Sequence, residues 1–210
     1  MADEASKLTL ADWRRSVAEL YAAARRAGEF DQDAAARGFR AARDELFKRH
    51  PQTPLDAAQR ISFTDLDYFP YDPAWRVLSI VEQSVERESW KTDLPEGLLR
   101  YTRDSVARFV CPEGEGQLSL FWIEGYGGGL FLPFRDGTNN RTSYGGGRYL
   151  YDTIKGADLG VGADEIVLDF NYAYNPSCAY APKWVCPLAP RENTLAFEVV
   201  AGEKSFPRRG

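Results

Sequence analysis

Arginine, carboxylate, amide and tyrosine side chains gather in the C-terminal half of the chain, in segments 134–140, 144–149 and 169–176. In the second segment, three consecutive glycines (Gly145–Gly147) stand directly before Arg148. Glycine tolerates positive φ and close backbone approach, so this stretch could offer amide donors and a guanidinium to an anionic group. The alternative is a bulge or hairpin in a curved sheet, with Arg148 paired to Asp169 or Asp136.

Asp169 is the leading acid–base candidate. It precedes Asn171 on the same predicted strand face, so both side chains would project together if that face lines a cleft. A buried carboxylate needs a partner, because unpaired burial costs on the order of several kcal/mol. Arg135 and Arg148 are the candidate partners. Such a pair either stabilises the fold or orients a substrate.

Cys178 and Cys186 flank a proline-containing loop and allow several interpretations. They could be inert buried thiols, or a disulfide contributing about 2–3 kcal/mol, which would conflict with a cytoplasmic location. A metal site would need further His, Cys or carboxylate ligands. A nucleophilic thiolate would need an activating group, and only arginine, Lys183 or Tyr180 are near in sequence.

The common catalytic signatures are absent from the sequence. It contains no P-loop, no His-Glu-x-x-His, no Gly-x-Ser-x-Gly and no Cys-x-x-Cys. The single histidine, His50, ends a predicted helix before Pro51, where it can act as a C-terminal cation or as a catalytic group. A relay of two histidines is therefore excluded.

The N-terminal quarter of the chain is predicted to be helical. Apolar residues recur at helical spacing over residues 10–27 and again over 33–50, where Arg40, Arg43 and Lys48 are expected to point away from the apolar face. Residues 51–73 are predicted to be an ordered connection. We expect residues 1–50 to form a helical segment packed on a β domain of residues 51–210.

The remainder of the chain is predicted to form strands, at residues 75–81, 99–110, 118–123, 130–134, 148–151, 165–170 and 194–200. Turn signals separate these segments, and none of the connections is long enough for a helical crossover between parallel strands. The expected fold is α+β and mostly β, with N-terminal helices followed by an antiparallel β-barrel or sandwich.

Composition limits the partners. Lys and Arg number 26 and Asp and Glu 31, so the net charge is −5, and the basic residues form no stripe that would suit nucleic acid. No apolar run approaches the length of a membrane span, and the acidic start resembles no signal peptide. We therefore expect a soluble cytoplasmic protein that binds neither nucleic acid nor membrane, with a homodimer as an open alternative.

Several motifs of the chain resemble the DUF1684 family of uncharacterised bacterial and archaeal proteins. The resemblance spans about residues 39–204 and rests chiefly on Phe131–Thr138, Tyr144–Leu150, Leu168–Tyr180, Cys186–Leu195 and Ala201–Lys204. It implies no activity, cofactor or catalytic residue. It does imply that one assembled feature is formed by Arg135, Asp136, Tyr144, Arg148, Asp169, Asn171, Tyr174, Asn175, Cys178, Cys186, Glu192 and Asn193.

The first functional hypothesis is a cleft that binds a small polar or anionic molecule, with acid–base catalysis as an extension. Asp169 or Glu192 would be the general base, and Tyr174 the proton donor. The expected ligand-binding residues are Arg135, Asp136, Tyr144, Gly146, Arg148, Tyr149, Asn171 and Asn175.

Two alternatives belong to other classes of function. One is a non-catalytic interaction module in which the helix at residues 10–27 binds a partner chain. The other is a flavin- or metal-assisted enzyme on a barrel scaffold, with Cys178 and Cys186 as the only candidate metal ligands. The sequence identifies no cofactor.

Overall fold

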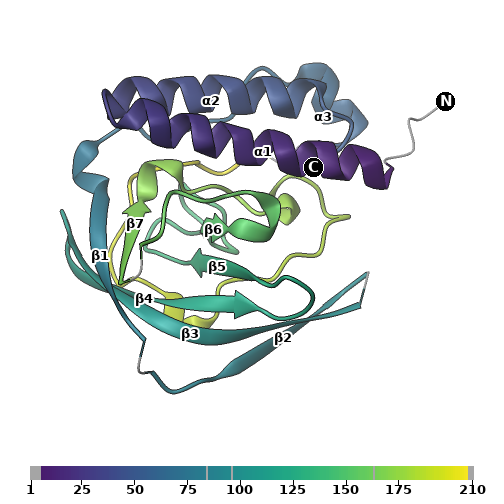
Figure 1. Cartoon of the computed structure of the whole chain (residues 1–210). Coiled ribbons are helices and arrows are strands. Elements are labelled where there is room, and N and C mark those ends of the chain that lie inside the picture. Colours follow the sequence, from purple (N-terminus) through teal and green to yellow (C-terminus); the bar gives the residue numbers. More distant parts are fainter. Residues whose placement is uncertain (1–5, 84, 96, 163, 208–210) are drawn as a thin grey trace.

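Two long helices begin the described part of the chain. The computed structural model describes residues 6–83, 85–95, 97–162 and 164–207. In helices α1 (Lys7–Gly28) and α2 (Gln32–Arg49), the capping side chains of Ser6 and Asp31 accept hydrogen bonds from first-turn N–H groups. The helices lie side by side across the concave side of a curled sheet (Figure 1). Both predicted helices are therefore confirmed.

The connection after α2 contains a short helix that was not predicted, α3 (Ala57–Ser62). The side chains of Asp56 and Gln59 cap it reciprocally, each accepting a hydrogen bond from the backbone N–H of the other at 2.8 and 2.7 Å. Six residues are too few to show a helical period, so the capping residues were its only sequence signal. None of the helices in the described residues is long and apolar enough to cross a membrane.

One antiparallel sheet of seven strands, curled into an open half-barrel, forms the rest of the fold (Figure 1). Its strands are β1 (Arg76–Glu82), β2 (Ser89–Leu94), β3 (Gly97–Cys111), β4 (Gly114–Ile123), β5 (Gly129–Phe134), β6 (Arg148–Asp152) and β7 (Glu165–Asp169). The order is β6-β5-β4-β3-β1-β7, and β2 also pairs with β3. The predicted class, α+β and mostly β, is confirmed.

Two strand assignments need correction. Strand β2 was not predicted, because its alternation is between half-buried and exposed residues and gives no apolar period. The strand predicted at residues 194–200 is wrong: the segment makes only an isolated bridge, between Thr194 and Arg135. Beyond the bond from Leu195 N–H to the Arg135 carbonyl, which belongs to this bridge, no ladder forms in the described part of the chain, and the N–H of Val199 donates to the Asp136 carboxylate.

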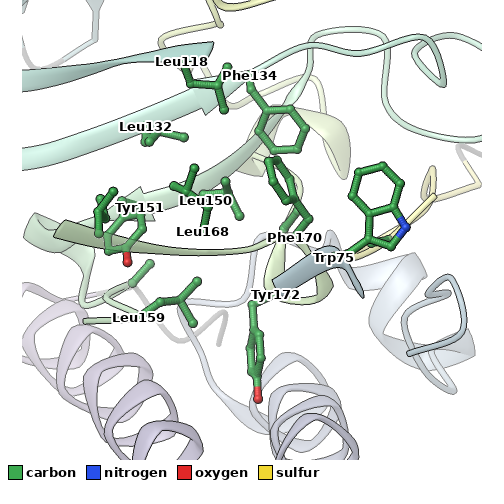
Figure 2. Close-up of a cluster of buried hydrophobic side chains, with 14 of the residues drawn as sticks. Trp75, Leu118, Leu132, Phe134, Leu150, Tyr151, Leu159, Leu168, Phe170 and Tyr172 are labelled. Carbon is green, nitrogen blue, oxygen red and sulfur yellow. The ribbon is translucent and has the colours of Figure 1, made fainter. Parts of the chain in front are cut away.

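Helices and sheet share one hydrophobic core. Val17, Tyr21 and Phe39 from the helices pack in the same cluster as strand residues such as Leu118 and Leu132. Figure 2 shows the interior of this cluster between the sheet and the helices. The N-terminal helices are therefore part of the structural body, and α1 is held in a fixed position over the sheet.

A glycine sets the distance between α1 and the sheet. Gly156 ends the 3₁₀ turn Thr153–Lys155 after β6 with φ +89°. A Cβ at this position would lie 2.7 Å from the backbone nitrogen of Ala18 and 2.9 Å from the carbonyl oxygen of Arg14. Only glycine satisfies both the backbone conformation and the close approach of α1.

Gly156→Ala is expected to destabilise the protein by about 2–4 kcal/mol, because left-handed strain adds to a backbone clash with α1. Gly160→Ala is the matched control: its φ is +108°, but the nearest atom to a Cβ there is 3.6 Å away. It should cost about 1 kcal/mol from strain alone. Urea unfolding measures the stability of both variants. Equal losses of unfolding free energy would contradict the close approach of α1 to Gly156.

Candidate functional site

A cavity of about 60 Å³, lined by both polar and apolar side chains, lies where α1, α2 and the chain around β6 meet. It is lined by residues of α1 (Trp13, Val17, Tyr21), of α2 (Arg43, Phe47), of β6 and the following turn (Tyr149, Asp152, Lys155, Ala157), of segment 174–180 (Tyr174, Asn175, Pro176, Ser177, Tyr180) and by Pro54. We call it the helix–sheet cavity. Segments far apart in sequence thus contribute to one cavity.

Three buried oxygen atoms of lining residues have no hydrogen-bond partner: Tyr21 Oη, Asp152 Oδ1 and Asn175 Oδ1. The three residues are only 1%, 2% and 3% exposed. Buried polar atoms in proteins are nearly always hydrogen-bonded, and each one left unpaired costs about 1–3 kcal/mol. Among the described residues, no other buried side-chain oxygen lacks a partner. The cavity therefore concentrates unmet hydrogen-bonding capacity.

The remaining polar atoms of these side chains fix their orientation. Asp152 Oδ2 forms an ion pair with the Lys155 ammonium at 3.0 Å. The Asn175 amide nitrogen donates to the Lys204 carbonyl at 2.7 Å, so its Oδ1 must be the free acceptor. The Tyr21 ring packs edge-on against Phe39. Each free oxygen is thus held in position by contacts made by the rest of its own side chain.

A buried carboxylate, that of Glu203, supports one wall of the cavity. Its Oε1 accepts from Arg43 Nε at 2.7 Å, and its Oε2 accepts from the Asn175 backbone N–H at 2.9 Å and from Tyr180 Oη at 2.6 Å. Glu203 is 1% exposed. Arg43 also stacks over the Tyr174 ring. The positive charge of Arg43 is therefore fully compensated inside the protein.

The tyrosines and the lysine that line the cavity keep their protons. Burial raises the pKa of Tyr21, Tyr149 and Tyr174, so these phenols stay neutral and can donate hydrogen bonds. The Asp152 carboxylate raises the pKa of the Lys155 ammonium. Because Tyr149 donates to the Pro187 carbonyl and Lys155 to Asp152, the groups left without a partner are the Tyr21 hydroxyl, a donor, and the Asp152 and Asn175 oxygens, which are acceptors.

The predicted ligand-binding arginine, Arg148, lies elsewhere. It is 0% exposed and donates to Asp136 Oδ2 at 2.9 Å and to the carbonyls of Val199, Ala201 and Glu203. Of its two expected partners it pairs with Asp136 and not with Asp169. These bonds anchor segment 199–203 to β6, so the geometry favours a structural role over an anion grip.

The other predicted ligand-binding groups are also engaged by the protein. Arg135 donates to the Gly145 carbonyl at 2.6 Å, and Asn171 exchanges hydrogen bonds with the backbone of Asp72. A Cβ at Gly146 would lie 2.5 Å from the Tyr144 ring, so this glycine is packed against protein. The cradle expected at Gly145–Gly147 is therefore filled, whereas Tyr149, Tyr174 and Asn175 do line the helix–sheet cavity.

The three predicted catalytic residues are not brought together. Tyr174 lines the helix–sheet cavity, whereas Asp169 lines a different one of about 240 Å³ beside Arg76, whose Nε is 3.8 Å from Asp169 Oδ2. Burial raises the pKa of Asp169, and its Oδ1 accepts two bonds from Asn171. Glu192 is exposed and lines neither cavity; its Oε1 lies 3.8 Å from Nη2 of Arg103 on β3. A shared acid–base pair of Tyr174 with Asp169 or Glu192 is not formed.

Sequence reasoning missed several residues of the cavity. Arg43 was expected to point away from the apolar face of its helix, but it is 5% exposed and lies four residues from both Phe39 and Phe47 on the buried face. The position of a charged residue within an apolar stripe was the sequence signal that could have identified Arg43 as buried. Tyr21 likewise sits in the apolar stripe of α1. Asp152 carried no local signal.

His50 has a capping and packing role. Its Nδ1 accepts from the backbone N–H of Gln52 at 3.0 Å, and its Nε2 lies 3.2 Å from the Asp12 carboxylate. Its ring meets the Trp13 indole edge-on. His50 therefore joins the end of α2 to α1.

Comparison with known proteins identifies relatives but no activity. A family model described as "Protein of unknown function (DUF1684)" matches residues 61–204. An uncharacterised protein of Haloarcula marismortui, solved by solution NMR, is 36% identical over 83% of this chain and 94% of that chain, with a TM-score of 0.60. No curated protein matches the chain. Asp152 and Asn175 lie within the family match, whereas Tyr21 and Arg43 precede it.

Arg148→Ala is expected to destabilise the protein by about 3–5 kcal/mol, since it leaves the buried Asp136 carboxylate and several carbonyls without their donor. Arg141→Ala, which removes an exposed ion pair with Glu198, should cost less than about 1 kcal/mol. Chemical denaturation measures both. If the Arg148→Ala protein is as stable as the Arg141→Ala protein, Arg148 is not needed for the fold and is again a candidate ligand-binding residue.

Proposed function

We propose that this chain, which belongs to the DUF1684 family of proteins of unknown function, binds a small polar molecule rich in N–H or O–H donors in the helix–sheet cavity. The observation that carries the proposal is that three of the residues lining this one cavity, Tyr21, Asp152 and Asn175, each have a buried side-chain oxygen without a hydrogen-bond partner. A ligand that donates to these atoms would recover the hydrogen bonds that folding leaves unmade.

The charge balance favours a donor-bearing ligand over an anion. Each cation of the cavity already has a carboxylate partner: Arg43 has Glu203 at 2.7 Å, and Lys155 has Asp152 at 3.0 Å. The unsatisfied atoms are two acceptors and one hydroxyl. An anion would place its charge beside Asp152 Oδ1, where like charges repel. An amine, amide or hydroxyl group matches the free acceptors instead.

Size and access restrict the ligand further. One water needs about 10–15 Å³, so a cavity of this size admits a molecule of a few non-hydrogen atoms. The Lys155 side chain is 51% exposed while its ammonium reaches Asp152. Lys155 therefore stands at the boundary between cavity and solvent, where a flexible side chain can move aside to admit a ligand.

Tyr21→Phe is expected to leave the ligand-free protein at least as stable as the parent, and up to about 1–3 kcal/mol more stable, because it removes a buried hydroxyl that has no protein partner. Tyr180→Phe is the matched control. Its hydroxyl donates to Glu203 at 2.6 Å, so its removal should cost about 1.5–3 kcal/mol. Urea unfolding distinguishes them. A loss with Tyr21→Phe equal to that with Tyr180→Phe would show that the Tyr21 hydroxyl serves the fold.

Ligand class is tested by amide-resolved NMR titration with ethanolamine, acetamide and ethylene glycol as donor-bearing probes and with acetate and phosphate as anions. The donor-bearing probes should shift the amide signals of Tyr21, Asp152 and Asn175, and Tyr21→Phe should weaken that binding by about tenfold. Shifts caused by the anions alone, or by none of the probes, would refute the proposal.

A further inference from the structure

Two thiols lie in direct contact beside the helix–sheet cavity. The backbone N–H of Cys178 donates to Cys186 Sγ at 3.3 Å, and both side chains are partly exposed. The thiol of Cys178 also hydrogen-bonds with that of Cys186 and raises its pKa. The remaining cysteine, Cys111, is 8% exposed and donates to the Gly114 carbonyl at 3.3 Å. One contacting pair and one isolated thiol are therefore present in the same chain.

We propose that Cys178 and Cys186 are a modification site, a dithiol that hydrogen peroxide oxidises to an intramolecular disulfide. A sulfur atom 3.3 Å from the backbone nitrogen of the other cysteine is within reach of its Sγ by side-chain rotation. In the described residues, no further side chain joins the pair to make a metal-binding cluster. This inference does not depend on ligand binding in the cavity.

The surroundings assign a different role to each sulfur. Tyr144 Oη donates to Cys178 Sγ at 3.6 Å, and such a hydrogen bond stabilises a thiolate there. Cys186 has a raised pKa, owing first to its hydrogen bond with Cys178 and next to burial, and so remains a protonated thiol. Cys178 is therefore the sulfur that attacks peroxide, and Cys186 is the resolving thiol.

The chemistry balances with peroxide as the only co-reactant. The Cys178 thiolate attacks one peroxide oxygen, the O–O bond breaks, and the departing hydroxide takes up the thiol proton as water while Cys178 becomes a sulfenic acid. Cys186 then attacks the sulfenic sulfur, an S–S bond forms, and the hydroxyl leaves as a second water. Two electrons pass from the two thiols to one peroxide.

The segment between the cysteines can accept the bond. Ala179, Tyr180 and Ala181 are buried, but Pro182, Lys183 and Val185 next to Cys186 are exposed, so this half of the loop can adjust without disturbing the core. Its ends are attached to the cavity: Ser177, next to Cys178, lines it, and the cavity residue Tyr149 donates to the carbonyl of Pro187, next to Cys186. Oxidation would therefore fix one wall of the helix–sheet cavity.

The test exposes the full-length protein to hydrogen peroxide, blocks free thiols with an alkylating agent and maps the peptides by mass spectrometry. We expect one cross-link, Cys178 to Cys186, reversed by dithiothreitol, with Cys111 still alkylated. Any of three results would overturn the inference. Cys178 and Cys186 could both remain alkylated, the main product could be a cross-link between chains, or Cys111 could be oxidised to the same extent.

Three variants test the assigned roles. Cys186→Ser should stop at a sulfenic acid on Cys178 that dimedone captures, whereas Cys178→Ser should leave Cys186 no more reactive than Cys111. Tyr144→Phe should slow disulfide formation by about threefold through the lost hydrogen bond, with the same end product. The two single variants can be compared directly. If Cys186 in the Cys178→Ser variant forms a sulfenic acid as fast as Cys178 does in the Cys186→Ser variant, the assignment of roles is wrong.

Discussion

The carboxylate of Glu203 connects the parts of the molecule from which the helix–sheet cavity is built. Its oxygens receive hydrogen bonds from Arg43 on α2, from Tyr180, and from the backbone of Asn175, and Tyr68 lies within 3.3 Å. A buried carboxylate is stable only when its lone pairs are met in this way. The C-terminal segment, α2 and segment 175–180 therefore hold one another in place.

This network fixes the direction of one of the three free oxygens of the cavity. Asn175 is anchored by its backbone N–H to Glu203 and by its side-chain nitrogen to Lys204, which leaves only Oδ1 free. Asp152 is anchored in the same way by Lys155. These oxygens are thus held in one direction, as the proposed binding of a small molecule requires, because preorganisation lowers the cost of binding.

Much of the fold could be predicted because its signals are local. The strand-favouring residues at 118–123 marked β4, and Pro51 marked the end of α2. The segment at residues 194–200 carried the same kind of signal and is not a strand, because its polar groups bond to Arg135, Asp136 and Arg148. The spacing of apolar residues alone cannot distinguish a strand from an irregular segment that buries the same side chains.

The site was harder to predict, because its members meet only in three dimensions. Tyr21 and Asn175 are separated by most of the chain, and Asp152 is the last residue of a buried strand and belongs to no motif. The glycines before Arg148 suggested an open anion cradle, but the guanidinium turns inward to backbone carbonyls of the C-terminal segment. Whether a guanidinium faces ligand or protein depends on those distant carbonyls, which local sequence does not reveal.

The central claim is that the three free oxygens of the helix–sheet cavity receive donors from a bound molecule. An atomic-resolution crystal structure of the protein soaked in ethanolamine tests it most directly. The account predicts continuous density for the probe within hydrogen-bonding distance of Tyr21 Oη, Asp152 Oδ1 and Asn175 Oδ1. Ordered water alone in the cavity, or oxygens rotated to pair with protein atoms, would contradict it.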